Sequence, residues 1–240
     1  MAHQDRSLLD NPAWFSLTTR HAHLAQGAGL ARRYDPAVAP FAGVESPVRE
    51  AFQALGQLIG PNESVAVLAL ADIPSVEGIR AEQIFTLLQM VCPEPGGAID
   101  DRDVVRLSSD NASEMLDLAQ RAKPGPFSIR TVETGNYIGI RDGGSLIAMA
   151  GERMSLAGHV EISAVCVDDN YRGRGIAARL MNVLRKEIQS RGDMPILHVL
   201  GDNMPAIGLY RRLGFEDRQS FRLFRIMRDD ADAQPESLHS

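Results

Sequence analysis

A basic, glycine-rich stretch holds the residues of this sequence that are best suited to binding chemistry. Residues 172–178 read RGRGIAA, after an apolar run and before a helical pattern. Gly173 and Gly175 can take positive φ angles, so several backbone N–H groups can point the same way. The N-terminus of the following helix carries a positive partial charge, which favours an anion by about 0.3–1 kcal/mol. A strand, a loop and a helix in this order predict a phosphate site.

Two widespread phosphate motifs do not match this loop. A P-loop requires GxxxxGK followed by Ser or Thr, and both the lysine and the hydroxyl are missing. A Rossmann fingerprint requires GxGxxG and an acidic residue about 20 positions further on, after a second parallel strand. A basic surface turn is the alternative that the loop alone leaves open.

A second stretch, residues 201–215, adds a candidate proton donor. It reads GDNMPAIGLYRRLGF, in which Asp202 or Asn203 can cap a helix and Gly214 can end it. Asn203 and Tyr210 are seven positions apart, so they share one helical face. A phenol with a pKa of about 10 can give its proton to a thiolate whose conjugate acid has a pKa of about 8.5. Tyr210 is therefore a candidate general acid, with a packing role as the alternative.

Together the two stretches resemble the GNAT acyl-CoA N-acyltransferases. Residues 161–181, EISAVCVDDNYRGRGIAARLM, resemble the coenzyme A motif of that family, and residues 203–215 resemble its following helix. With the upstream segment NPAWFSLTTRHAHLA, the pattern is similar to the FR47-like subgroup, which is related to glycine N-acyltransferases. The resemblance covers about Val104 to Arg228, and the first hundred residues match loosely.

The resemblance implies roles for individual residues. Backbone groups of Val165, Cys166 and Val167 would line the pantetheine arm and hold the acetyl carbonyl, on a strand that splays from its neighbour. Asn203 would reach the pantetheine arm, and Tyr210 would protonate the departing thiolate. Backbone N–H groups of the loop would bind the pyrophosphate. The predicted cofactor-binding loop consists of Arg172, Gly173, Arg174, Gly175, Ile176, Ala177 and Ala178.

Three residues are candidates for the group that deprotonates the amine. An amine substrate arrives as ammonium and must lose a proton before it attacks the thioester. In one branch of the family a glutamate acts from the strand position five before the asparagine, which here is His198, with an ordinary pKa of about 6.5. Glu161, acting directly or through a water, and Glu152 are the alternatives. The catalytic candidates are therefore Tyr210, His198 and Glu161.

The elements that must position these residues follow a regular order after residue 100. We expect a strand at 103–107, a helix at 111–122, a short helical piece, three strands within 136–167, a helix from the loop to about 191, a strand at 195–200, a helix and a last strand at 220–227. Short glycine turns join the three strands as a meander. This order predicts an α+β fold, the GNAT fold by resemblance, with a mixed, mostly antiparallel central sheet flanked by helices.

Three regions are expected along the chain. Residues 1–100 form an N-terminal α/β domain, for which the resemblance suggests a degenerate copy of the same half-fold. Periodicity does not decide between helix and strand for residues 78–91. The breaker run PEPGG at 93–97 marks the boundary, residues 101–228 form the GNAT domain, and residues 229–240 form an acidic, frayed tail.

Composition excludes several classes of protein. The net charge of −6 gives no bulk attraction to nucleic acid or to anionic membrane. Cys92 and Cys166 provide neither a disulfide framework nor a metal site. The N-terminus lacks a signal-peptide pattern and no apolar run is long enough to span a membrane, so a cytoplasmic protein is expected.

These observations converge on one functional hypothesis. We expect an acyl-CoA-dependent N-acyltransferase that moves acetyl from acetyl-CoA, without a metal, to a small-molecule or peptide amine by direct attack in a ternary complex. The alternative is a non-catalytic acyl-CoA-binding or sensing module, which would not need the proton donor Tyr210. The N-terminal domain is expected either to close over the site or to form a homodimer.

Overall fold

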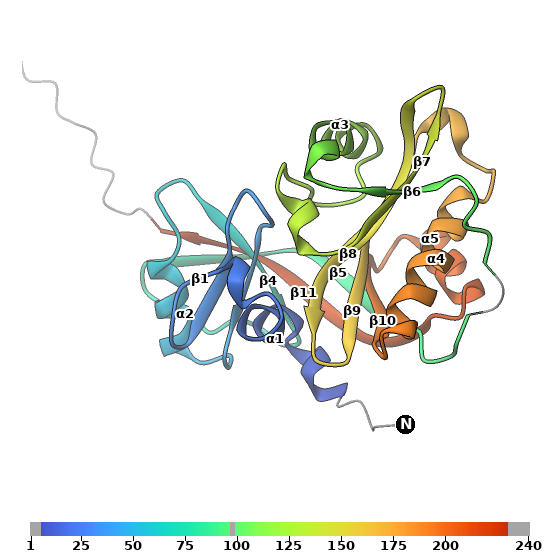
Figure 1. Cartoon of the computed structure of the whole chain (residues 1–240). Coiled ribbons are helices and arrows are strands. Elements are labelled where there is room, and N and C mark those ends of the chain that lie inside the picture. The colour runs from blue at the N-terminus through green and yellow to red at the C-terminus, as the bar shows by residue number, and fades with distance from the viewer. Residues whose placement is uncertain (1–5, 97–98, 230–240) are drawn as a thin grey trace, which may run out of the picture.

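One twisted sheet organises the computed structural model, which describes residues 6–96 and 99–229 (Figure 1). Its strand order is β1-β2-β3-β4-β11-β5-β10-β9-β8-β7-β6. The strands are β1 Ala25–Gln26, β2 Ala31–Tyr34, β3 Phe41–Val44, β4 Ser64–Ala69, β5 Ile79–Val91, β6 Val104–Leu107, β7 Tyr137–Asp142, β8 Ser145–Leu156, β9 His159–Val167, β10 Met194–Leu200 and β11 Glu216–Arg228. Neighbours are antiparallel except for the pairs β3–β4 and β9–β10.

Five α-helices and five short 3₁₀ turns connect the strands in the described ranges. The helices are α1 Pro12–Thr18, α2 Arg49–Gln57, α3 Ala112–Ala122, α4 Ile176–Ser190 and α5 Met204–Arg212. The turns are η1 Arg6–Asp10, η2 Ala22–Leu24, η3 Ser109–Asn111, η4 Thr131–Thr134 and η5 Asp169–Tyr171. Among the described helices, none is long and apolar enough to cross a bilayer.

The predicted α+β class and the mixed, mostly antiparallel sheet are confirmed. The elements expected after residue 100 are present in the expected order, and the last strand is longer than predicted because it begins at Glu216. Of the predicted tail, residues 230–240 lie outside the described residues. The idea that the N-terminal region copies the half-fold stays a prediction.

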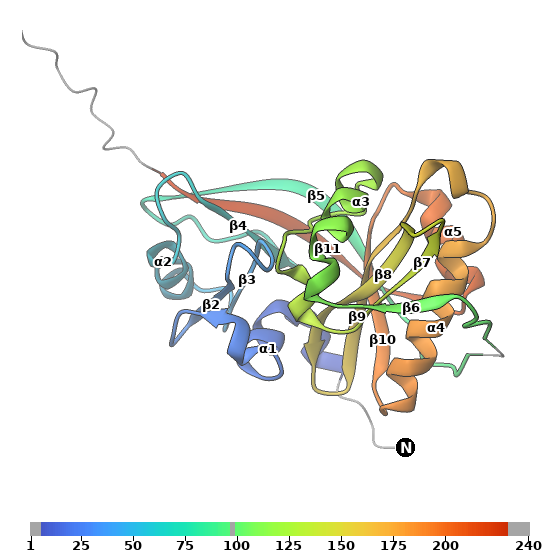
Figure 2. The same cartoon turned by 45° about the horizontal axis from the view of Figure 1, so that its top comes forward.

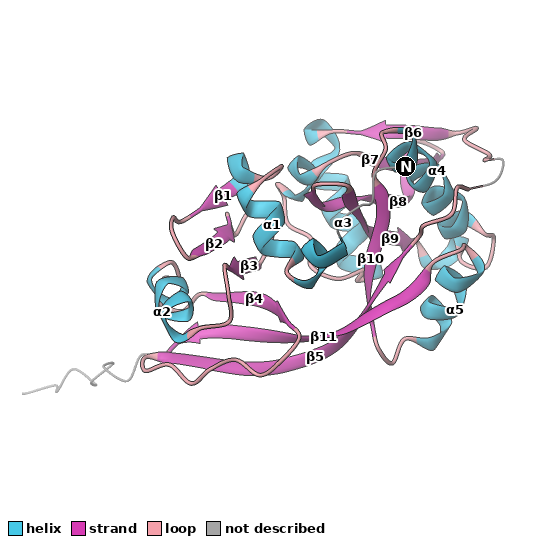
Figure 3. Ribbon diagram, turned by 90° about the horizontal axis from the view of Figure 1, so that it is seen from below, coloured by secondary structure: helices cyan, strands magenta, loops and turns pink. Residues whose placement is uncertain are grey.

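Strands β5 and β11 join the two halves of the sheet. They pair with each other over nearly their full lengths, while β11 also pairs with β4 and β5 also pairs with β10. Figure 3 shows the two strands running side by side across the molecule. Pairing with β11 along residues 79–91, and with β10 at residues 87–91, therefore makes this segment a strand, where periodicity alone was ambiguous. The sheet continues across residue 100, and the division into two domains stays a prediction.

Helices cover both faces of the C-terminal half of the sheet (Figure 2). Because side chains alternate along a strand, Val165 and Val167 of β9 pack with the cluster under α4, whereas Ala164 and Cys166 pack with the cluster under α3. Helix α4 is amphipathic, and its buried stripe includes Leu180, Leu184 and Ile188. This packing fixes the start of α4 against the end of β9.

The N-terminal segment reaches the same part of the sheet. Helix α1 packs against β3 and β8, and Arg20 forms an ion pair of 2.7 Å with Asp193, just before β10. The buried Tyr34 hydroxyl is hydrogen-bonded to Ser16 Oγ and to His21 Nδ1, each at 2.9 Å. Burial, and then the neighbouring His23, lower the pKa of His21 to about 4, so this imidazole is neutral near pH 7. Residues 16–34 are thus anchored by these polar contacts.

We predict that Phe221→Ala destabilises both halves of the chain together. Phe221 of β11 is 0% exposed and packs with residues of α1 and of β4. Loss of such a buried ring costs about 3–5 kcal/mol. Trp14, the only tryptophan of the sequence, reports on the N-terminal half by fluorescence, and far-UV circular dichroism reports on the whole chain. Both signals should shift to the same lower denaturant midpoint.

The control is Phe85→Ala on the paired strand β5, because Phe85 is 50% exposed. This change should cost less than about 1 kcal/mol. Two separate transitions in the Phe221 variant, one for each signal, would contradict the prediction.

Candidate active site

A β-bulge interrupts the central strand β9. Met149 pairs with Cys166 and Gly151 pairs with Ser163, so two residues of β9, Ala164 and Val165, lie opposite one residue of β8. Ala164 has a φ of 52°, a left-handed conformation that is uncommon for a residue with a Cβ. A bulge leaves its extra residue unpaired and re-aims the neighbouring groups. Sequence reasoning missed this feature, since no glycine marks it.

Strands β9 and β10 part beyond Glu161. They pair only where Met194, Pro195 and Ile196 face residues 159–161. Further along, β10 continues against β5 as far as Leu200, while β9 continues against β8 as far as Val167. The splay that the resemblance implies is therefore present, and it lies beside the bulge.

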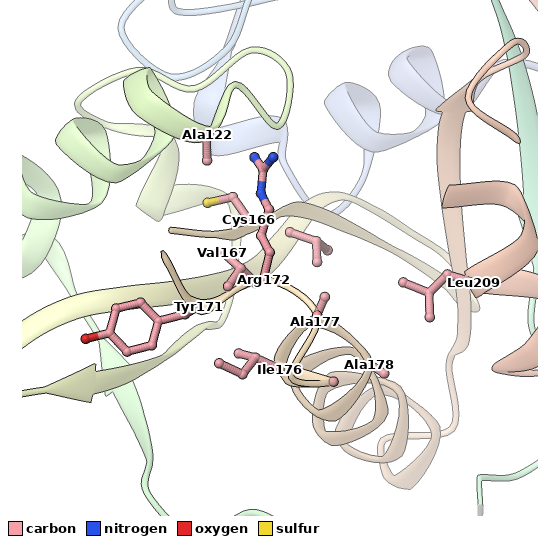
Figure 4. A pocket seen from close by; sticks show the side chains of 12 residues that line it. Ala122, Cys166, Val167, Tyr171, Arg172, Ile176, Ala177, Ala178 and Leu209 are labelled. Atoms are coloured by element: carbon pink, nitrogen blue, oxygen red, sulfur yellow. The ribbon is translucent and has the colours of Figure 1, made fainter. Parts of the chain in front are cut away.

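A cleft of about 380 Å³ lies at the end of β9, where α4 begins (Figure 4). It is lined by Ala122, Val165, Cys166, Val167, Tyr171, Arg172, Gly173, Gly175, Ile176, Ala177, Ala178 and Leu209. All predicted strand and loop residues line it except Arg174, and Asn203 is not among the lining residues. Ala122, Tyr171 and Leu209 were missed, because α3 and α5 reach the cleft only through tertiary packing. Burial raises the pKa of the Cys166 thiol to about 12, so this sulfur is a poor nucleophile.

The loop backbone offers a row of unused hydrogen-bond donors. Gly173 and Gly175 have φ angles of 76° and 74°. Gly175 is the N-cap of α4 and contributes no side-chain cap. Within the described residues, the N–H groups from Gly173 to Ala178 donate to no protein acceptor, and the first bond of the helix is from Arg179 N to Gly175 O, at 3.0 Å. No atom lies within 4 Å of the position of a Cβ on either glycine, so a diphosphate can approach this backbone.

Side-chain contacts brace this loop on both sides. The Tyr171 hydroxyl donates to Asp142 Oδ2 at 2.6 Å, and the Arg174 guanidinium lies 4.9 Å from the centre of the Tyr171 ring. Asp168 accepts a hydrogen bond from Asn170 N at 3.1 Å, and Arg172 forms an ion pair with the exposed Asp169. The donor row is therefore pre-arranged, and both arginines of the motif keep their charge at its edge.

Helix α5 carries the other two residues that the sequence singled out. Asn203 Oδ1 accepts a hydrogen bond from Ala206 N at 3.2 Å, so Asn203 caps the helix. Tyr210 is half-buried, and its ring packs edge-on against Phe215 at 6.2 Å. In the described part of the chain its hydroxyl has no hydrogen-bond partner, and burial raises its pKa. Tyr210 is thus a protonated phenol with a free donor. It is not among the residues that line the cleft, although the preceding residue, Leu209, is.

The two remaining catalytic candidates, His198 and Glu161, lie together in a buried ion network. Glu161 accepts bonds from Arg153 Nε at 2.9 Å and Arg153 Nη2 at 2.5 Å, and its Oε1 is 2.8 Å from His198 Nδ1. The side chains of Glu161 and His198 are 0% and 1% exposed. Burial alone would raise the pKa of Glu161, but the Arg153 charge and the bonds from both partners hold it well below its ordinary value. Glu161 is therefore a carboxylate throughout the range of enzyme assays.

Glu152, the third candidate for the base, has other partners. Its Oε1 forms an ion pair of 2.5 Å with Arg191, and its Oε2 accepts from Asn136 N at 3.3 Å. Glu152, Glu161 and His198 are all absent from the lining of the cleft. Among the described residues, no group of three or more His, Cys, Asp or Glu side chains is arranged to hold a metal ion.

Comparison with known proteins gives consistent results. Residues 137–223 match a family model described as FR47-like protein. A crystal structure of a protein assigned to the GNAT acetyltransferase family, from Novosphingobium aromaticivorans, is 35% identical with a TM-score of 0.85, over 92% of this chain and 98% of that chain. A GCN5-related N-acetyltransferase from Kribbella flavida is 15% identical with a TM-score of 0.58, over 89% of this chain and 95% of that one. This second likeness concerns the fold alone.

Curated relatives match over shorter stretches. The chain is 38% identical over 99 residues to the N-alpha-acetyltransferase RimI of Mycobacterium tuberculosis, a match that covers 39% of this chain and 60% of that protein. It is 41% identical over 68 residues to the mycothiol acetyltransferase of Corynebacterium jeikeium, over 28% of this chain and 18% of that protein. The chain thus spans less than two thirds of either relative.

We predict that Gly175→Ala weakens coenzyme A binding. A Cβ at this position would strain a left-handed backbone by about 1–2 kcal/mol and would disturb the donor row. Since a hydrogen bond to a charged group contributes about 1.5–3 kcal/mol, loss of one raises the dissociation constant by about tenfold or more. Isothermal titration calorimetry measures this change.

The matched control is Gly192→Ala, just beyond the other end of α4. Gly192 has a φ of 84° and equally open space around its Cβ position. The substitution Gly192→Ala should therefore lower the stability of the fold about as much as Gly175→Ala does, without changing the affinity for coenzyme A. Equal affinities for the two variants would show that the loop is not the anion site.

Proposed function

Because the chain belongs to the GNAT acetyltransferase family, we propose that it transfers acetyl from acetyl-CoA to a primary amine by direct attack within a ternary complex. The observation that carries this proposal is the row of unpaired N–H groups from Gly173 to Ala178 beside the bulge of β9. A row of six donors at a helix N-terminus suits a diphosphate, and the splay of β9 and β10 suits an extended arm next to it.

The strand and loop residues bind and orient the acyl donor in this scheme. Backbone groups around Val165, Cys166 and Val167 hold the pantetheine arm and the acetyl carbonyl, and the loop holds the pyrophosphate. Asn203 has its Oδ1 in the helix cap, so its amide nitrogen is the group left to meet the arm. Holding the thioester in one place lets an amine attack without a further loss of freedom.

Tyr210 is the proposed general acid. The neutral amine nitrogen attacks the thioester carbonyl, the C–N bond forms and the C–S bond breaks. The phenol proton passes to the departing thiolate, and the proton that the nitrogen loses as it becomes an amide restores the phenol by way of solvent. The raised pKa of Tyr210 keeps the phenol protonated at neutral pH, and its hydroxyl has no competing partner among the described residues. The hydroxyl without a partner favours proton donation over a packing role alone, whereas the raised pKa only ensures that the proton is present.

Glu161 is the candidate base that the geometry favours. Both ring nitrogens of His198 already have partners, Glu161 and Gln89. Glu152 is paired with Arg191. Glu161 Oε2 accepts a single bond, from Arg153 Nε, and so keeps capacity for another. We propose that this oxygen attracts the ammonium and orients a water that takes its proton on to solvent, since the side chain is fully buried and its lowered pKa makes it a weak proton acceptor.

The acceptor is proposed at the level of chemical class. The names of the two curated relatives indicate acetylation of an α-amino group for one and an acetyl transfer connected with mycothiol for the other, so we include both peptide and small-molecule amines in the test panel. A homodimer and a cytoplasmic location stay predictions from the sequence.

We predict that the protein releases coenzyme A thiol from acetyl-CoA when an amine acceptor is supplied. Tyr210→Phe should lower kcat about 100-fold, the low end of general-acid effects, while the KM for acetyl-CoA changes less than about twofold. A thiol-reactive dye with a panel of peptides and small amines measures both constants.

The matched control is Tyr137→Phe. Tyr137 is 1% exposed and its hydroxyl also lacks a partner among the described residues, yet it packs in the cluster under α3, whereas Tyr210 packs against the cluster under α4. This variant should keep full activity. Tight coenzyme A binding without turnover on any amine would instead favour the non-catalytic binding module, and full activity of Tyr210→Phe would remove Tyr210 as the acid.

We predict that Arg153 controls the acidic side of the pH profile. The lowered pKa of Glu161 means that its charge is lost only as the pH falls through that lowered value, below the ordinary 4.5. Wild-type kcat/KM should therefore show no acidic limb from Glu161 above about pH 5. In Arg153→Gln, burial is no longer opposed by the guanidinium, so the pKa rises and an acidic limb enters the measured range.

Arg153→Lys is the control, because it keeps the positive charge next to Glu161. Initial rates with the best acceptor between about pH 5 and 9 should show the limb in the glutamine variant alone. The same limb in all three proteins would assign it to the acceptor instead.

A further inference from the structure

The side chain of Gln89 is buried next to His198 and Glu161, the ion network that holds the proposed catalytic carboxylate. Gln89 is on β5, directly opposite His198 of β10 in the antiparallel pairing, and it is 0% exposed. Its Nε2 is 3.0 Å from His198 Nε2. This buried amide has no role in the proposed acetyl transfer itself.

Two neighbours fix which way the Gln89 amide faces. Arg218 Nη1 lies 2.8 Å from Gln89 Oε1, and a guanidinium can only donate. The carbonyl oxygen of Leu9 lies 3.1 Å from Gln89 Nε2, and a carbonyl can only accept. Both contacts require the same orientation, with the oxygen toward Arg218 and the NH₂ group toward Leu9. A flipped amide would turn two hydrogen bonds into two repulsive contacts.

This orientation decides the protonation of His198. The second hydrogen of Gln89 Nε2 points to His198 Nε2, which must therefore accept and carry no proton. The proton of the neutral ring is then on Nδ1, where it donates to Glu161 Oε1 at 2.8 Å. Since a carboxylate only accepts, this bond independently requires the same tautomer.

The tautomer determines how the two oxygens of Glu161 are used. Oε1 accepts from both His198 Nδ1 and Arg153 Nη2, whereas Oε2 accepts from Arg153 Nε alone. The carboxylate is thereby held in one rotamer, with one oxygen saturated and the other available. A protonated His198 would keep its bond to Glu161 but would repel the Gln89 NH₂ group.

We infer that Gln89 is a positioning residue. Its carboxamide holds His198 as the neutral Nδ1–H tautomer, and His198 in turn holds Glu161 so that Oε2 is the oxygen left to attract the ammonium and orient its water. The catalytic part of this inference rests on the proposed acetyl transfer, while the tautomer does not. The other charged groups that face this chain are Arg153 on the Glu161 side, and Arg218 with its partner Asp10 on the Gln89 side.

The tautomer can be read directly by nitrogen NMR. The full chain is labelled with ¹⁵N-histidine, and the His198 signals are identified from a His198→Gln variant. Long-range ¹⁵N–¹H correlation spectra of the wild type should show a protonated Nδ1 and an unprotonated Nε2 at pH 7 to 8. A proton on Nε2 in the wild type would overturn the inference, whatever any variant does.

Gln89→Glu tests the consequence for activity. A carboxylate in place of the NH₂ group should draw a second proton onto His198 and lower kcat by at least about tenfold, since small misplacements of reacting groups cost up to about 100-fold. The KM for acetyl-CoA should stay unchanged, because Gln89 does not line the cleft. The matched control is Gln219→Glu, which is the same charge change at the exposed residue opposite Gln89 on β11.

The outcomes separate the two proposals. The expected spectra with an unchanged kcat in Gln89→Glu would refute the positioning role. No turnover in any of the proteins, wild type included, would refute the proposed function, and the spectra alone would then decide whether Gln89 fixes the His198 tautomer.

Discussion

The parting of β9 and β10 is the constraint on which the rest of the candidate site depends. Where two neighbouring strands separate, each keeps its hydrogen bonds on its other edge, while the N–H and C=O groups that face the gap have no strand partner. Here β10 continues against β5 and β9 continues against β8. The cleft at the end of β9 can therefore exist without unpaired strands, and α4 begins at its edge. The anion-binding role proposed for the N–H groups of the loop depends on this space beside them.

Near the start of β9, the buried charges of Arg153 and Glu161 impose a different requirement. Removal of one partner from a buried ion pair costs about 3–5 kcal/mol, so Arg153 and Glu161 must stay matched. The Arg153 guanidinium also lies 4.7 Å from the centre of the Phe41 ring, and Gln89 completes the bonding of His198. Phe41 and Gln89 both precede residue 100. The N-terminal part of the chain thus supplies the surroundings in which the proposed catalytic carboxylate keeps its charge.

The sequence was most informative where the signal is local. Gly173 and Gly175 need left-handed backbone angles and stand before an amphipathic helix, so the loop could be predicted and its residues do line the cleft. The meander of β7, β8 and β9 was predicted from its short turns. The bulge at Ala164 and the roles of Arg153 and Gln89 could not be predicted, because each depends on partners from distant parts of the chain. The strand β5 was ambiguous for the same reason, since its neighbours decide its conformation.

The position of β5 between β10 and β11 has a consequence for any attempt to shorten this protein. A fragment that starts after residue 100 would contain β10 and β11 but not the strand that both of them pair with. Each would then expose a row of unpaired N–H and C=O groups along a long edge, which is a template for aggregation. The fragment would carry the glycine-rich loop and the helix that follows β10, yet it would lack the strand that makes its sheet continuous. Truncation studies of this chain should therefore keep β5.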